Sequence, residues 1–200
     1  MEFQTAKKLF AVGLILWIIP FINIVGLILT LIGAYGLSQH YHRRGIFWNL
    51  LYAVIVPFVG ALVLFPAFLA ASFDAMYDAT RIFQLLTAVV IILILAPIVL
   101  ILWAFFIRRA YMNLFEASNV NNFKTAAKLI LIGVLILLAA IPLAIIATPL
   151  AIEFMSAVSA ILGLLGVVLM FIGHIFAIIG AFRLKPPTQL LTYTSQYGYR

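Results

Sequence analysis

His174 is the residue of this sequence whose type and position could most readily do chemistry. It lies within a long apolar stretch, where an ionisable side chain is a candidate haem ligand, proton relay or quinone contact. A haem between helices commonly needs a second axial ligand, and the other histidines, His40 and His42, lie at the end of another apolar stretch. A neutral histidine that hydrogen-bonds to a neighbouring helix is the alternative. The sequence leaves both interpretations open.

Catalysis and metal binding have little support elsewhere in the chain. Ser156 and Ser159 could pair with His174 as nucleophile and base, but neither serine stands in a G-x-S-x-G sequence. The chain has no cysteine, which excludes thiolate metal sites and cysteine nucleophiles. It also lacks the H-E-x-x-H and G-x-x-x-x-G-K-[ST] motifs. We therefore expect a non-enzymatic protein with no metal and no cofactor of its own, His174 being the one candidate for cofactor binding.

The basic residues are typical of a membrane surface. The net charge is +7, but lysine and arginine occur singly or in pairs between apolar runs, without the aromatic and basic platform that binds nucleic acid. Basic side chains near the ends of apolar segments extend toward anionic lipid headgroups. The candidates for headgroup contact are Lys8, Lys128, Arg43, Arg44, Arg108 and Arg109. We expect no nucleic acid partner.

Composition indicates the class of protein that holds these residues. Hydrophobic residues make up 67% of the chain and charged residues 8%, whereas soluble domains have about 25% charged residues. We therefore expect an all-α integral membrane protein. The apolar stretches predict six transmembrane helices over Thr5–Ile19, Asn23–Tyr41, Ile46–Ala71, Thr80–Phe115, Phe123–Ile141 and Ala157–Phe182. Prolines help to separate the helices, Pro20 within the first pair and Pro142 within the last.

Charge placement predicts the orientation. With six spans, every lysine and arginine except Arg81 falls on one side of the membrane. Cytoplasmic loops collect lysine and arginine, so this side is the cytoplasm. The sequence therefore predicts a multi-pass protein of the cell membrane with both termini cytoplasmic.

The two ends of the chain carry a repeated sequence. The residues Phe3, Thr5, Ala6, Lys8, Leu9 and Gly13 recur 120 positions later as Phe123, Thr125, Ala126, Lys128, Leu129 and Gly133. Gly26, Leu29, Ile32 and Gly33 recur 140 positions later as Gly166, Leu169, Ile172 and Gly173. The copies, about 2–42 and 122–183, predict a duplicated parallel helical hairpin connected by the third and fourth helices.

Glycines follow one face of the second and sixth predicted helices. Gly26 and Gly33 are seven residues apart, as are Gly166, Gly173 and Gly180. Small residues let helices approach closely in lipid. We expect these glycines to pack helices two and six, in equivalent positions at the bundle centre, against their neighbours. A glycine-lined conduction path is the alternative.

Two segments are candidates for contact with a partner. The fourth helix is long enough to extend into the cytoplasm and display Arg108, Arg109, Tyr111 and Met112. After the single six-helix membrane domain, 1–185, residues 186–200 form a tyrosine-rich cytoplasmic tail. Its residues Tyr193, Tyr197 and Tyr199 are expected to contact that partner.

The segment from Gly26 to Gly60 carries a family resemblance. Gly36-Leu37-Ser38 is followed by His40-Tyr41-His42 and then by Gly45-Ile46-Phe47-Trp48-Asn49; Phe123 opens and Ala181-Phe182 closes the second copy. This order resembles the archaeal integral membrane proteins of domain of unknown function 996, in which an acidic residue usually stands where this chain has Gln39. The resemblance implies an archaeal cell membrane and provides no known activity or site residue.

Three functions remain open at this point. The first is an accessory or scaffold subunit of a larger membrane assembly, with other membrane subunits or a second copy as partner. The second is a small transporter or channel for an apolar or cationic solute, which a continuous cavity reaching His174 would favour. The third is a redox membrane subunit that uses His174.

Overall fold

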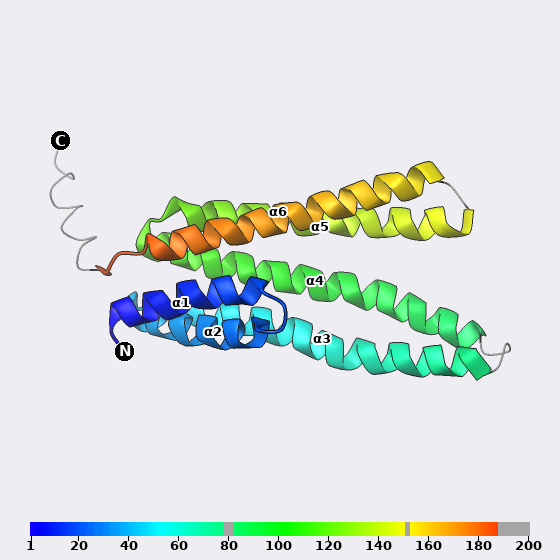
Figure 1. Cartoon of the computed structure of the whole chain (residues 1–200), viewed down its shortest axis with the longest axis horizontal. Coiled ribbons are helices and arrows are strands. Elements are labelled where there is room, and N and C mark those ends of the chain that lie inside the picture. The colour runs from blue at the N-terminus through cyan, green and yellow to red at the C-terminus, as the bar shows by residue number, and fades with distance from the viewer. Residues whose placement is uncertain (78–81, 151–152, 188–200) are drawn as a thin grey trace.

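Six α-helices form the described part of the chain, as three consecutive antiparallel hairpins (Figure 1). The computed structural model describes residues 1–77, 82–150 and 153–187. The helices are α1 (Phe3–Ile18), α2 (Asn23–His40), α3 (Arg44–Tyr77), α4 (Ile82–Ser118), α5 (Asn121–Leu150) and α6 (Glu153–Phe182). For these residues the prediction of an all-helical protein with six helices is confirmed.

Four of the helices are long and apolar enough to cross a bilayer. Their apolar segments are Arg44–Pro66, Leu93–Ser118, Asn121–Ala144 and Glu153–Phe182. The remaining two are shorter, because α1 has 16 residues and α2 has 18. At 1.5 Å per residue these two are about 24 and 27 Å long, against a hydrocarbon core of about 30 Å. The lengths and apolar composition are those of a multi-pass membrane protein.

Proline does not end the later helices as the sequence suggested. Helix α5 continues past Pro142 to Leu150, so the expected end at Ile141 is wrong, whereas α6 begins at Glu153, four residues before the expected Ala157. A proline within a helix removes one backbone hydrogen bond, which neighbouring groups in a membrane bundle can compensate. The prolines of α3 and α4 are likewise inside continuous helices.

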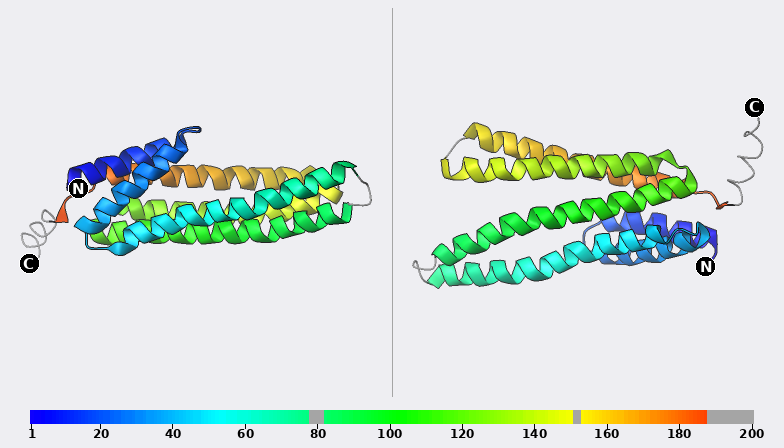
Figure 2. Two further views of the ribbon diagram at one scale, coloured as in Figure 1. Left: turned by 90° about the horizontal axis from the view of Figure 1, so that it is seen from below. Right: turned by 180° about the vertical axis from the view of Figure 1, so that it is seen from behind.

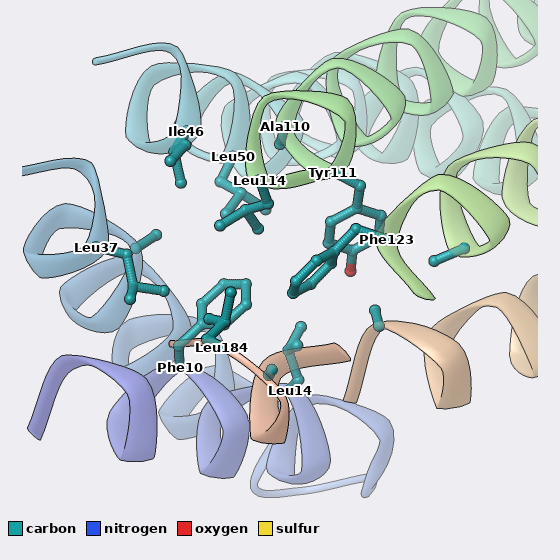
Figure 3. Close-up of a cluster of buried hydrophobic side chains, with 14 of the residues drawn as sticks. Phe10, Leu14, Leu37, Ile46, Leu50, Ala110, Tyr111, Leu114, Phe123 and Leu184 are labelled. Carbon is teal, nitrogen blue, oxygen red and sulfur yellow. The ribbon is translucent and has the colours of Figure 1, made fainter. Parts of the chain in front are cut away.

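The helices form a ring that is closed at the end of the bundle near the N-terminus. Each helix contacts the next one in the chain, and α6 contacts α1 (Figure 2). No helix therefore lies at the centre, which corrects the expectation that α2 and α6 would do so. Buried side chains fill the ring instead, including Phe10, Leu37 and Tyr111 from three helices and Leu184 from the segment after α6 (Figure 3).

Tyr111 corrects a second expectation. Its side chain is fully buried in this core, beside Phe123 of α5, where the ring centroids are 6.0 Å apart. It is therefore not displayed for a partner. Arg108 and Arg109, one turn or less away in α4, are exposed as expected.

The first hairpin is much shorter than the other two. Its turn, between Ile18 and Asn23, lies beside the middle of the long helices, and α3–α4 and α5–α6 continue past it (Figure 1). Phe21 in this turn has a φ of 71° and is fully exposed. Beyond the turn the two long hairpins diverge and continue without the first one (Figure 1). We call the end where all three hairpins pack together the closed end, and the end with only the long hairpins the open end.

Candidate functional site

His174 lies where the closed ring gives way to the open end. Its imidazole stands edge-on to the indole of Trp17, the last turn of α1, with ring centroids 4.9 Å apart and an interplanar angle of 77°. Within the described part of the chain the imidazole makes no hydrogen bond. Its contact with the neighbouring helix is thus aromatic, in place of the hydrogen bond that the sequence interpretation allowed.

A cavity of about 510 Å³ adjoins this pair. Five helices contribute to this one space, through Trp17 of α1, Leu27 of α2, Pro57 of α3, Trp103 of α4 and Met170 of α6. The rest of its lining is also apolar. Such a volume is typical of sites for small molecules, which are mostly apolar with few polar groups.

A second cavity, of about 270 Å³, brings His174 to the first one. It is lined by His174 and shares Trp17, Trp103 and Met170 with the larger cavity. The two cavities therefore adjoin each other at Trp17, Trp103 and Met170. Together they provide an apolar site with one imidazole at its edge.

The packed core begins one turn away from this site. Leu14 lies one turn before Trp17 in α1 and is fully buried, as are Phe10 and Tyr111 (Figure 3). The site therefore lies beside the packed core, at the level where the first hairpin ends.

The serines do not join His174. Ser159 is about 22 Å from it along α6, at 1.5 Å per residue, and its hydroxyl donates to the carbonyl oxygen of Ala140 in α5 at 2.9 Å. Ser156 donates to the carbonyl oxygen of Glu153 in its own helix at 2.8 Å. The described residues thus bring no nucleophile and base together, and they hold no group of side chains suited to a metal ion.

The glycines of α2 lie directly against α1. A Cβ at Gly26 would stand 2.3 Å from the backbone nitrogen of Trp17, and one at Gly33 would stand 2.3 Å from that of Phe10. The surface of α1 that faces α2 also lacks a side chain at Gly13, where a Cβ would stand 2.4 Å from the backbone nitrogen of Thr30. Only glycine fits these positions without moving backbone.

The glycines of α6 lie against α5 at corresponding places. A Cβ at Gly166 would stand 2.7 Å from the carbonyl oxygen of Gly133 and 3.0 Å from the backbone nitrogen of Leu137. One at Gly173 would stand 2.8 Å from Ile130. Gly133, Leu137 and Ile130 occupy the positions 120 residues after Gly13, Trp17 and Phe10. The same positions of the repeat therefore contact each other in both hairpins.

Gly180 lies on the same face of α6 and packs less closely against α5. A Cβ there would stand 3.2 Å from both Asn122 and Phe123. Phe123 lies 120 positions after Phe3, and Phe3 packs edge-on against His40 of α2 with centroids 5.5 Å apart.

The basic residues are held in different ways. Arg43 forms an ion pair with Glu116 of α4, and the guanidinium of Arg109 lies 4.6 Å from the ring centroid of Phe105. The remaining headgroup candidates are exposed and make no ion pair among the described residues: Lys8, Arg44, Arg108 and Lys128.

Trp17 and Trp103 are the site residues that sequence reasoning missed. Tryptophan is enriched at the two surfaces of a membrane, yet Trp103 lies well inside the apolar segment of α4. A tryptophan so far from the ends of an apolar segment is the sequence feature that could have identified Trp103 as a site residue. The tail residues Tyr193, Tyr197 and Tyr199, and Arg81, lie outside the described residues.

Comparison with known proteins provides a family and no activity. The sequence profile of a family described as protein of unknown function (DUF996) matches residues 22–148, which is more than half of the chain. No curated protein and no solved structure matches. The chain belongs to the DUF996 family.

Proposed function

We propose that this chain is a non-enzymatic membrane protein that binds a small lipid-soluble molecule between its diverging hairpins. The cavity beside His174, Trp17 and Trp103 carries this proposal. Its walls suit an apolar body, and the imidazole, which has no hydrogen-bond partner in the described part of the chain, suits one polar group on that body. Access is lateral, from the lipid, because the core fills the ring.

Binding of this kind is the first step of a carrier for apolar solutes. A short-chain alkyl benzoquinone is a suitable probe, because it combines an apolar chain with carbonyl acceptors and quenches tryptophan fluorescence on contact. We expect saturable quenching of Trp17 and Trp103 in the purified protein. His174→Asn should weaken the binding by about tenfold, which corresponds to about 1.4 kcal/mol for one lost buried hydrogen bond.

His42 provides the matched control. It is exposed at the closed end of the bundle and has a φ of 51°, which asparagine tolerates. His42→Asn should leave quenching unchanged. Equal quenching in both variants, or quenching that rises linearly without saturation, would contradict a specific site.

We propose further that all six helices cross the membrane as a duplicated hairpin plus a connecting pair, with both termini in the cytoplasm of an archaeal cell. The paired contacts of Gly13 with Gly26 and of Gly133 with Gly166 support the duplication. The placement of basic residues supports the orientation. Lys7 donates to the carbonyl oxygen of Leu184 at 2.9 Å, so basic segments from both chain ends lie at one end of the bundle.

The absence of cysteine makes this topology easy to test. In intact cells, a membrane-impermeant maleimide should label Phe21→Cys from outside and Glu2→Cys only after permeabilisation. Protection of Phe21→Cys would mean that the short first hairpin turns back within the bilayer. In that case both termini would still lie on one side of the membrane. The orientation is tested independently by Glu2→Cys, because its labelling from outside in intact cells would contradict cytoplasmic termini.

An accessory or scaffold subunit is the second candidate function. Apolar side chains of the long hairpins remain exposed beyond the turn of the first hairpin, among them Phe58, Leu62 and Leu164. A helix of another membrane subunit, or of a second copy, could cover them. Native mass spectrometry of protein extracted from its own membranes tests this role, since stoichiometric co-purification with larger subunits supports it and a lone monomer excludes it.

A further inference from the structure

A separate pocket lies at the closed end of the bundle, between the end of α2 and the start of α3. Its volume is about 250 Å³, and it is lined by Tyr35, Ser38, Gln39, Arg44, Phe47 and Trp48. Ser38, Gln39 and Arg44 give this lining polar side chains, whereas the lining of the 510 Å³ cavity is apolar and aromatic. The pocket therefore suits a ligand that is itself part polar and part apolar.

Arg44 is the charged group of this pocket, and it is free to bind an anion. The nearby Glu116 is paired with Arg43. Arg44 is exposed and makes no ion pair within the described part of the chain. Guanidinium groups bind phosphate through paired hydrogen bonds, so a phosphate is the natural partner for Arg44.

The aromatic residues continue from Arg44 along α3. Trp48 and Tyr52 follow Arg44 at intervals of four residues, so the three share one face of the helix. Phe47 lies between Tyr35 of α2 and Trp48, with centroid distances of 5.4 and 5.6 Å. Trp48 and Tyr52 are 47% and 43% exposed, so this aromatic face is open to the surroundings.

This order of side chains matches the layers of a membrane surface. Tryptophan and tyrosine prefer the headgroup level, and a basic side chain one turn above them reaches the phosphates. We propose that the pocket binds one phospholipid through its phosphate, with Arg44 on the phosphate and Trp48 against the glycerol region. The proposal requires a membrane at this end of the bundle but is independent of the cavity beside His174.

Quenching of Trp48 tests the proposal. Trp17→Phe and Trp103→Phe leave Trp48 as the only tryptophan, because the chain has three. In detergent, phosphatidylglycerol with brominated chains should quench Trp48 at a lower mole fraction than diacylglycerol with the same chains. Arg44→Gln should raise the half-quenching concentration about fivefold, the factor expected from about 1 kcal/mol per basic residue at an anionic surface.

Two controls separate this site from weaker explanations. Arg44→Lys keeps the charge without the paired hydrogen bonds and should lose less affinity than Arg44→Gln. Arg183→Gln removes an exposed arginine that follows α6, outside the pocket, and should have no effect. Equal loss in Arg44→Gln and Arg183→Gln, or no loss in either, overturns the proposal. Displacement of the lipid by millimolar inorganic phosphate also overturns it, because the pocket would then be a site for free anions.

Discussion

The indole of Trp17 and the imidazole of His174 join the first and the last hairpin of this protein, with ring centroids 4.9 Å apart in an edge-on arrangement. Trp17 belongs to the last turn of α1, and His174 lies well within α6. Since α6 meets α1 to close the ring, this pair stands at the boundary between the packed core and the open cavities.

This contact predicts a measurable coupling. Trp17→Leu and His174→Leu should each destabilise the protein, and the double variant should be less destabilised than the sum of the two. We expect a coupling of about 0.5–1.5 kcal/mol, as for other aromatic pairs. A double-mutant cycle of reversible unfolding in mixed micelles measures it, and strict additivity would show that the rings do not interact.

Alanine substitutions at Gly163 and Gly166, both in α6, should have opposite effects on stability. A Cβ at Gly166 meets backbone of α5, whereas a Cβ at Gly163 meets nothing within 4 Å. Gly166→Ala should lower the free energy of unfolding by about 1–3 kcal/mol through overpacking. Gly163→Ala should raise it by up to about 1 kcal/mol through helix propensity. Thermal unfolding followed by circular dichroism gives both signs, and equal effects would contradict the close approach.

Gly26 should behave as Gly166 does, because its Cβ would meet the backbone of Trp17. Gly26→Ala is therefore expected to destabilise the first hairpin by a similar amount, about 1–3 kcal/mol. The same unfolding measurement checks this, and a neutral result would mean that α1 and α2 separate more easily than α5 and α6.

Two tyrosines test the value of a buried hydroxyl. Tyr41 donates a hydrogen bond to the carbonyl oxygen of Lys185 at 2.6 Å. Burial raises the pKa of the Tyr41 phenol, so it stays protonated as a donor at neutral pH. Tyr41→Phe should therefore cost about 0.5–1.5 kcal/mol of stability.

Tyr111 provides the contrast, because its buried hydroxyl has no hydrogen-bond partner among the described residues. Tyr111→Phe should be neutral or stabilising, since it removes an unsatisfied polar group and keeps the ring. Chemical denaturation of both variants checks the pair. A larger loss in Tyr111→Phe than in Tyr41→Phe would indicate a partner for this hydroxyl that the described residues do not include.

Ser159 and Ser156 distinguish an interhelical hydrogen bond from a local one. Ser159 is buried and its hydroxyl joins α6 to α5 through Ala140, whereas Ser156 bonds within its own helix and is exposed. Ser159→Ala should lower stability by about 0.6 kcal/mol, the average for such bonds in membrane bundles. Ser156→Ala should change it by less, and the reverse order of the two would be inconsistent with this packing.

The Arg43–Glu116 ion pair is expected to contribute little. Both side chains are roughly half exposed, at 44% and 48%. Glu116→Gln should therefore lower stability by less than about 1 kcal/mol, and the loss should shrink as salt is added. Unfolding at two ionic strengths tests this, and a salt-independent loss above that size would indicate a pair shielded from solvent.

The sequence by itself determined the helical class and the number of helices in the described residues. Long apolar runs with few charges can fold in lipid only as helices that satisfy their own backbone hydrogen bonds, and Pro20 indicated the break between the first two helices. The glycine positions also predicted close contact, because seven-residue spacing keeps small residues on one helix face.

Only the tertiary structure decided what surrounds each side chain. The burial of Tyr111 depends on where α5 lies, since the same apolar residues can face lipid or protein. The continuation of α5 past Pro142 depends on the surroundings of the helix, which local propensity does not include. The cavity beside His174 forms where the first hairpin ends and the long hairpins diverge, so it depends on how three hairpins of unequal length pack together, which no single segment encodes.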